Sequence, residues 1–130
     1  FYNVYGPREI SIGKYATLIA LFKEKVKNNE PLTVVSPGTQ KRNFTHVNDI
    51  IDGIILVGEN GFGDNFGIGS DKSNSILQIA KLFGSEIIML PERPGNRFTA
   101  DIVTEKTKFL GWKQSKSIED YISEFKNTLI

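Results

Sequence analysis

Apolar side chains recur at helical spacing in five stretches of the chain, and this pattern predicts five helices. The first helix is expected over residues 14–28, with one apolar face made of Tyr15, Leu18, Ile19, Phe22 and Val26. The second is expected over residues 47–57, with inward positions Ile50, Ile51, Ile54 and Ile55. In the first helix the lysines and Glu24 lie off the apolar face, which is typical of a helix with one solvated side.

The three later helices carry recognisable start or stop signals. The third follows Ser75, a favourable N-cap, and ends at Gly84, which can adopt the left-handed conformation of a helix C-terminus. The fourth is short, over residues 104–110, and stops at Gly111. The last begins at Ser117. Its apolar positions are Ile118, Tyr121, Ile122, Phe125 and Leu129.

Short runs with strand character lie between these helices. They cover residues 32–35, 65–68 and 87–90, and a shorter run at 43–45 precedes the second helix. Strands that alternate with helices predict a small α/β fold in which part of the sheet is parallel. With 39% hydrophobic side chains in 130 residues, the chain can form one core, so we expect a single domain over residues 1–130.

Composition narrows the classes of function and of partner. Sixteen basic and fifteen acidic residues give a net charge of +1, so no global field favours nucleic acid or an anionic membrane. The absence of cysteine excludes disulfides and thiolate metal ligands and fits a reducing compartment, and a single histidine argues against a zinc site. No long apolar run or signal segment is visible, so we expect a cytoplasmic chain. Residues 1–5 start in an apolar run without methionine, which suggests a piece of a longer protein.

Two segments could bind a phosphorylated ligand. Arg93 and Arg97 flank a Pro-Gly turn, and a guanidinium group offers paired donors that match phosphate oxygens. The alternative for this loop is a solvated turn with two surface arginines. In the second segment Arg42 and Phe44 lie two residues apart and would share one face of a strand, as a nucleotide site could require. Here the alternative is a core phenylalanine beside a surface arginine. His46 is interpreted as a satisfied residue at the start of a helix.

The order of five motifs resembles the extended short-chain dehydrogenase family. The motifs are FYNVYGPR (1–8), GTQKRNFTHVND (38–49), NFGIG (65–69), RPG (93–95) and LGWK (110–113). The resemblance covers essentially the whole chain and is greatest to the NAD-dependent nucleotide-sugar epimerases and dehydratases that are similar to UDP-glucose 4-epimerase. It implies that residues 1–130 are a C-terminal substrate-binding domain, with the N-terminal Rossmann domain absent.

The resemblance also implies roles for individual residues toward the diphosphate of a nucleotide sugar. Asn3, Arg42 and Arg93 match positions that contact the diphosphate in the family. A UDP-sugar is the favoured ligand, and the sugar itself is left open.

Four further positions match the family's nucleoside contacts. Phe44 stands where many members have an aromatic residue, and Thr33 and Val35 match a strand whose backbone passes the base. Asn96 matches a position that often carries a carboxylate toward the ribose. An asparagine can accept the same hydrogen bond without charge, so this departure affects the nucleoside contact.

The residues by which this family binds NAD and carries out catalysis are not found in this sequence. The family binds NAD through a glycine-rich loop, which the chain lacks, and uses a tyrosine with a lysine four residues later as its base. Four residues after Tyr2, Tyr5, Tyr15 and Tyr121 stand Gly6, Glu9, Ile19 and Phe125. We therefore expect no catalytic residue and no bound NAD on this chain, with NAD bound by the intact parent.

Two alternatives remain open at this stage. The parent could be a nucleotide-diphosphate-sugar 4,6-dehydratase, or the chain could be a stand-alone nucleotide-binding module without catalysis. An excised domain would also expose the apolar surface that the missing Rossmann domain covers, and we expect self-association there.

Overall fold

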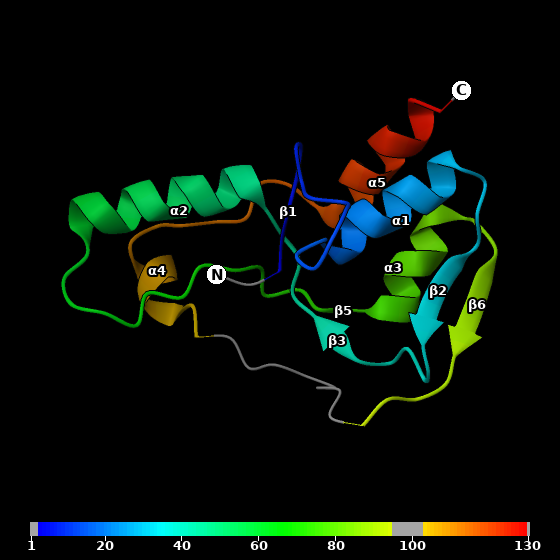
Figure 1. Cartoon of the computed structure of the whole chain (residues 1–130). Helices are drawn as coiled ribbons and strands as arrows, with labels where there is room; N and C mark the ends of the chain where they lie inside the picture. The colour runs from blue at the N-terminus through cyan, green and yellow to red at the C-terminus, as the bar shows by residue number, and fades with distance from the viewer. Residues whose placement is uncertain (1–2, 95–102, 130) are drawn as a thin grey trace.

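The computed structural model describes residues 3–94 and 103–129, and in these ranges short strands alternate with five helices (Figure 1). The strands are β1 (Val4–Tyr5), β2 (Leu32–Val35), β3 (Lys41–Arg42), β4 (Thr45–His46), β5 (Asn74–Ser75) and β6 (Ile87–Leu90). The helices are α1 (Leu18–Lys27), α2 (Val47–Asn60), α3 (Ile76–Phe83), α4 (Glu105–Phe109) and α5 (Ile118–Asn127). This arrangement confirms the predicted α/β class with five helices and short strands.

The strands of the described residues form three separate pairs. β1 pairs with β4 and β2 pairs with β6, both in parallel, whereas β3 and β5 are antiparallel. In the longest pair Leu32 lies opposite Ile87 and Val35 opposite Leu90. A partly parallel arrangement was predicted, and the pairs β1–β4 and β2–β6 confirm it.

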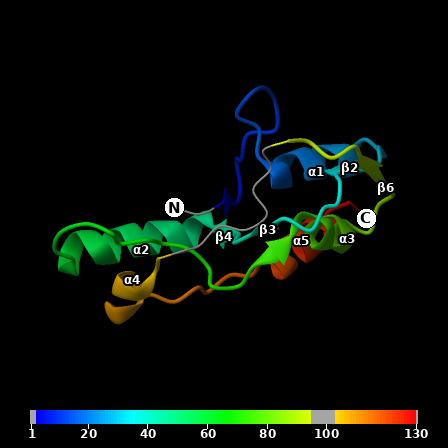
Figure 2. The ribbon, with the colours of Figure 1, turned by 90° about the horizontal axis from the view of Figure 1, so that it is seen from below.

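The main core lies between β2 and the helices α1, α3 and α5 (Figures 1 and 2). Its aromatic rings meet edge to face, with centroids 5.7 Å apart between Phe22 and Phe83 and 6.0 Å apart between Phe83 and Phe125. Ile79 and Leu32 are fully buried in this core. The core therefore holds together segments that are about 100 residues apart in the sequence.

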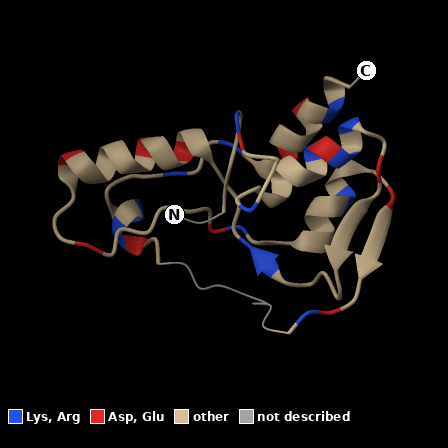
Figure 3. Ribbon diagram, in the orientation of Figure 1, with Lys and Arg blue, Asp and Glu red and all other residues tan. Residues whose placement is uncertain are grey.

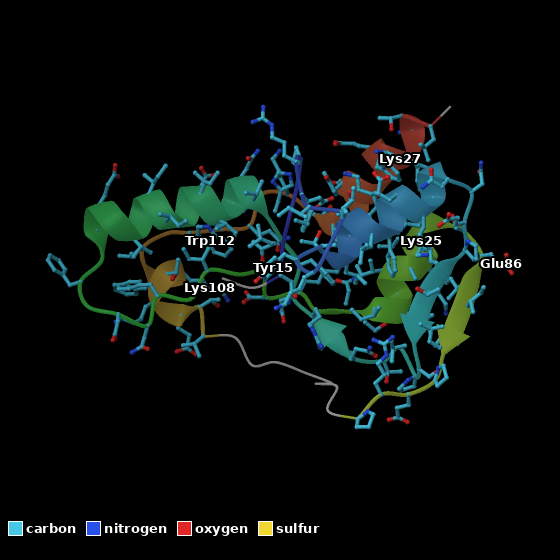
Figure 4. All side chains as sticks on the ribbon, in the orientation of Figure 1. Tyr15, Lys25, Lys27, Glu86, Lys108 and Trp112 are labelled. Atoms are coloured by element: carbon cyan, nitrogen blue, oxygen red, sulfur yellow. The ribbon has the colours of Figure 1, made fainter. Side chains whose placement is uncertain are left out.

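A second, smaller cluster lies beneath α2. Ile50, Ile68 and Trp112 are buried together, and the indole Nε1 of Trp112 donates a hydrogen bond of 2.9 Å to the carbonyl oxygen of Asp49 (Figure 4). Gly53 permits this close approach, because a Cβ atom there would lie 2.7 Å from Cγ2 of Ile68. The loop before α5 is thus attached to the first half of α2.

Local capping signals set several helix ends as predicted. Ser75 Oγ accepts from the Gln78 amide at 3.0 Å, and Gln78 Oε1 accepts from the Ser75 amide at 2.7 Å, which makes a capping box at α3. Gly84 ends this helix in the left-handed conformation, with φ of 72°. At α5 the hydroxyl of Ser117 caps the amide of Asp120 at 3.1 Å.

The prediction for the first helix was wrong at its start. α1 begins at Leu18 rather than at residue 14, because Thr17 Oγ1 accepts from the amide of Ala20 and caps the helix there. Tyr15 lies before the helix and is 76% exposed instead of facing the core (Figure 4). At the other end of the chain α5 stops at Asn127, so Leu129 lies outside the helix and is exposed.

The prediction for the inward face of α2 was also wrong. Ile50 is buried, but Ile51, Ile54 and Ile55 are 47%, 45% and 53% exposed. The helix packs through Ile50 and Gly53, and no other described element covers the remaining apolar side. The helix also continues to Asn60, three residues beyond the predicted end.

Two predicted strands differ in the structure. The run 65–68 is not a strand, since it pairs with no described strand; instead the Gly67 carbonyl accepts from Thr107 Oγ1 at 2.7 Å. Of the run 43–45 only Thr45 is in a strand, at the start of β4, and β3 lies before the run. Among the described residues no helix is long and apolar enough to span a bilayer.

Candidate functional site

Five of the predicted binding residues lie around one cavity of about 260 Å³ between β2, β3 and α1. They are Asn3, Thr33, Val35, Arg42 and Phe44. An adjoining cavity of about 200 Å³ shares Asn3, Leu18 and Phe44 with the first. Together these two spaces reach the size of a small-molecule site, for which about 300–1,000 Å³ is usual.

Arg42 of β3 and Phe44, which follows this strand, supply one wall of the cavity. Lys41 and Asn43 do not line it: Lys41 is exposed and Asn43 is buried. The Asn43 amide donates to the carbonyl oxygens of Ser70 at 2.8 Å and of Lys72 at 3.3 Å. Figure 3 shows β3 in the colour of lysine and arginine. Arg42 and Phe44 therefore line the same cavity, although Phe44 lies outside the strand in which it was predicted.

Phe44 is both a core residue and a cavity-lining residue, the two alternatives that the sequence left open. Its ring is 6% exposed and packs in the main core, yet it also lines both cavities. Arg42 is half-buried, and its Nη1 donates to the carbonyl oxygen of Lys41 at 2.8 Å. A charged group thus stands beside an apolar wall inside one cavity.

β2 presents an open backbone edge to the same cavity. The Leu32 amide donates to Glu86 and the Ser36 amide donates to Leu90, both at 2.8 Å, so alternate residues of β2 face β6. The backbone groups of Thr33 and Val35 must therefore point to the opposite edge, where no described strand pairs with them. Both residues line the cavity, which gives it backbone donors and acceptors.

Asn3 holds an unusual backbone conformation at the mouth of this site. Its φ is 38°, in the left-handed region that asparagine tolerates better than most residues. Its carbonyl oxygen accepts from the amide of Thr45 at 3.3 Å, which attaches it to β4. Asn3 thus lines the cavity with its backbone tied to β4.

Of the remaining two predicted residues, the structure describes only Arg93. Arg93 follows β6 in an exposed segment and is not one of the residues lining the cavity. Asn96 and Arg97 lie outside the described residues.

Gln40 lines the cavity but was not predicted from the sequence. It lies two residues before Arg42, so the alternation that identified Arg42 and Phe44 extends to it. Its backbone carbonyl accepts from the Ile76 amide at 3.0 Å, and the carbonyl of Gly38 accepts from the Leu77 amide at 3.0 Å. The loop 38–40 therefore caps the start of α3. Gly38 has φ of 75°, and a Cβ there would lie 2.8 Å from Cγ1 of Val34.

A second polar cluster fixes the loop that follows β1. Lys23 Nζ donates to Tyr121 Oη at 2.9 Å and pairs with Glu9 Oε1 at 3.2 Å, and Tyr121 donates to the same carboxylate oxygen at 3.2 Å. The other Glu9 oxygen accepts from the Gly6 amide at 3.0 Å. Burial raises the pKa of Tyr121, although the Lys23 contact opposes this. The cluster therefore keeps the phenol protonated and anchors the loop to α1 and α5.

The histidine of the chain acts as a helix cap, as predicted. His46 Nδ1 accepts from the Asn48 amide at 3.0 Å at the start of α2. Burial lowers the pKa of His46, and the charge of Lys116 lowers it further. Nearby Asp49 is fully buried and accepts from the Ser115 amide, the Ser115 hydroxyl and the Lys116 amide at 2.6–3.1 Å. These groups organise the fold rather than the cavity.

Another cavity of the described residues has a different character. It measures about 420 Å³ and lies between the end of α2 and α4, with mainly apolar walls that include Phe62, Phe66 and Phe109. None of the predicted binding residues lines it. In the described part of the chain no group of three or more His, Asp or Glu side chains could hold a metal ion.

Comparison with known sequences connects this site to a family. The profile of the family described as "NAD dependent epimerase/dehydratase family" matches residues 1–69. The chain is 29% identical over 130 residues to UDP-glucuronic acid decarboxylase 5 of Arabidopsis thaliana, covering 92% of this chain and 36% of that protein. It is 27% identical over 151 residues to dTDP-D-glucose 4,6-dehydratase of Bos taurus, covering 96% and 40%.

Solved structures show the same relation. UDP-glucose 4-epimerase with UDP-glucose from Thermotoga maritima matches with a TM-score of 0.82 and 29% identity, over 99% of this chain and 45% of that one. UDP-glucuronic acid 4-epimerase of Bacillus cereus, in complex with UDP-glucuronic acid and NAD, matches with a TM-score of 0.80 and 25% identity. That match covers 98% of this chain and 43% of that one. The chain thus spans less than half the length of these relatives.

Proposed function

Because the chain belongs to the NAD dependent epimerase/dehydratase family, we propose that it binds the nucleoside diphosphate of a nucleotide-diphosphate sugar. The parent protein would be an NAD-dependent nucleotide-sugar epimerase, most similar to UDP-glucose 4-epimerase. The observation that carries this proposal is the single cavity around Asn3, Thr33, Val35, Arg42 and Phe44.

The chemistry of the cavity walls suits the parts of a nucleoside diphosphate. Arg42 supplies a guanidinium group, whose charge-assisted hydrogen bonds to phosphate contribute about 1.5–3 kcal/mol. The ring of Phe44 supplies a flat apolar surface. The open edge of β2 at Thr33 and Val35 can pair with the donors and acceptors of a base, as an additional strand would.

The remaining chemistry is assigned to the rest of the parent protein. The chain spans 45% of the Thermotoga epimerase and 36% of the Arabidopsis decarboxylase. We assign the NAD site and the tyrosine–lysine base to the part outside this chain, where NAD would accept a hydride from the sugar. Residues 1–130 would then hold the nucleotide in position. Arg42 would contact it, and Arg93 and Asn96, which follow β6 in the sequence, would be further contacts.

The exposed apolar side of α2 supports the proposal that another domain of the parent protein packs against this helix. Ile51, Ile54 and Ile55 lie side by side on this helix at spacings of one to four residues, and all three are about half exposed. We propose that the Rossmann domain of the parent covers this side. A chain produced without that domain would associate with itself there.

A 4,6-dehydratase parent is the second candidate, since the bovine dTDP-D-glucose 4,6-dehydratase aligns over 96% of this chain. The two candidates differ in the expected nucleotide, which is uridine diphosphate for the first and thymidine diphosphate for the second. A stand-alone binding module would hold the nucleotide in the same cavity without catalysis.

Calorimetric titration of the chain with UDP, dTDP and GDP tests the proposal. We expect saturable binding that prefers UDP, and we expect Arg42→Ala to weaken it by about 10- to 100-fold through the loss of phosphate contacts. The matched control is Lys41→Ala, which removes a neighbouring charge from the opposite side of β3. The control should bind within about twofold of the wild type, because exposed charges contribute little.

The outcomes separate the candidates. A preference for dTDP would favour the dehydratase, and equal losses in the two variants would show that Arg42 acts only through net charge. A folded chain that binds no nucleotide would contradict the proposal that these residues form the site by themselves.

A further inference from the structure

Gln40 carries a buried polar group that the fold leaves unsatisfied. The side chain is only 7% exposed, and its Oε1 atom has no hydrogen-bond partner among the described residues. Buried acceptors without a partner cost free energy and are few in native proteins. The hydroxyl of Tyr5 is similarly unpaired, but Tyr5 is not among the residues that line the candidate site, whereas Gln40 is.

The backbone of Gln40 is held firmly in place. Its carbonyl accepts from the amide of Ile76, the first residue of α3, and the carbonyl of Gly38 accepts from the amide of Leu77. These bonds satisfy two amides that would otherwise be unpaired at the start of the helix. The backbone of Gln40 therefore cannot move away from the cavity without uncapping α3.

The position of Gln40 along the wall suggests which part of a nucleotide it meets. Gln40 lines the same cavity as Thr33 and Val35 of β2 and as Arg42, which follows it by two residues. In a nucleoside diphosphate the ribose lies between the base and the phosphates, so a base at β2 and phosphates at Arg42 bring the ribose to Gln40.

The hydrogen-bonding groups of the Gln40 side chain match those of a ribose. Ribose hydroxyls both donate and accept hydrogen bonds, and a carboxamide offers an oxygen acceptor and two N–H donors. We infer that Gln40 is a specificity-determining residue whose carboxamide binds a ribose hydroxyl of the nucleotide. This inference rests on the proposed function, because it requires a nucleotide in the cavity.

The test compares wild type and Gln40→Leu in titrations with UDP, 2′-deoxy-UDP and 3′-deoxy-UDP. Leucine has a similar volume and cannot form hydrogen bonds. Wild type should bind one deoxy analogue about 3- to 10-fold more weakly than UDP, as expected for the loss of one hydrogen bond. Gln40→Leu should bind UDP as weakly as wild type binds that analogue, and should no longer distinguish the two ligands.

Thermal unfolding of the free chains separates binding from a structural role. Gln40→Leu removes an unsatisfied buried oxygen, so its melting temperature should equal or exceed that of wild type. The matched control is Gln114→Leu, which loses bonds to Ser70 Oγ at 2.5 Å and to the Lys116 carbonyl at 2.7 Å, outside the cavity. This control should melt at a lower temperature and bind UDP as wild type does.

Two results would overturn the inference while leaving the proposed function intact. One is UDP binding by Gln40→Leu with the same affinity and the same ribose preference as wild type. The other is a melting temperature lowered as far as in Gln114→Leu, which would make Gln40 structural. Failure of folded wild type to bind UDP is a separate outcome that would overturn the proposed function together with the inference.

Discussion

The two ends of the molecule bury their apolar residues to very different extents. Around β2, the helices α1, α3 and α5 enclose a core in which Ile79 and Ile122 are at most 1% exposed. Around α2 and α4 the buried cluster is small, and Phe62 and Phe109 are more than 90% exposed. Figure 2 shows this second region extending away from the first.

This difference shows that the two regions cover their apolar helices unequally. In the first region α1, α3 and α5 bury their apolar residues in one common cluster, so its stability depends on contacts within the chain. The second region has an apolar helix, α2, with partners on one side only. Its exposed side is the natural place for a further layer, since domains bury apolar helix faces against another element.

The difference in burial between the two regions is tested most directly by making the same substitution, isoleucine to alanine, in each of them. Ile79→Ala should lower the free energy of unfolding by about 2–5 kcal/mol, because it leaves a cavity in the packed core. Ile54→Ala, on the exposed side of α2, should change it by less than about 0.5 kcal/mol. Urea unfolding followed by circular dichroism measures both. Similar losses would show that α2 is buried in solution.

An intermediate effect is expected where α2 is attached to the rest of the chain. Asp49→Ala leaves the Ser115 amide, the Ser115 hydroxyl and the Lys116 amide without their acceptor, which should cost about 1–3 kcal/mol of unfolding free energy. Asp52→Ala, one turn along and exposed, is the control and should be nearly neutral. If the two variants unfold at the same urea concentration, the attachment contributes nothing.

The smallest effect on stability is expected on the exposed side of α2, where the readout is association. Ile51→Lys with Ile55→Lys should leave the free energy of unfolding within about 0.5 kcal/mol. The same variant should sediment as a monomer at concentrations where wild type self-associates. Leu21→Lys, an exposed position on α1, is the control and should not alter sedimentation. A wild-type chain that is monomeric throughout would argue against an exposed domain interface.

Features with local causes could be predicted from the sequence. The ends of α3 follow from Ser75 and Gly84, because the cap and the left-handed glycine act within a few residues. The exposed side of α2 was predicted wrongly because periodicity identifies an apolar face without identifying what covers it. The run 65–68 failed for a related reason, since strand character needs a neighbouring strand to become a sheet.

In the candidate site, too, some residues could be predicted from the sequence and others could not. Arg42 and Phe44 were predicted to lie on one side of a strand from their spacing alone, and both line the cavity although only Arg42 is in a strand. Gln40 was missed because an unsatisfied carboxamide is visible only once its surroundings are known. Arg93 lies in an exposed segment away from the cavity lining, so its role toward a diphosphate stays a prediction, as does that of Asn96.

The alternation of Gln40, Arg42 and Phe44 along one wall has a consequence for how this site can vary. All three line the cavity at every second position, although only Arg42 lies in a strand, so inserting or deleting one residue just before them would change which side chains line it. Single substitutions can adjust one contact at a time. Changes in length between Gly38 and Gln40 would instead remove the site in one step and uncap α3 as well.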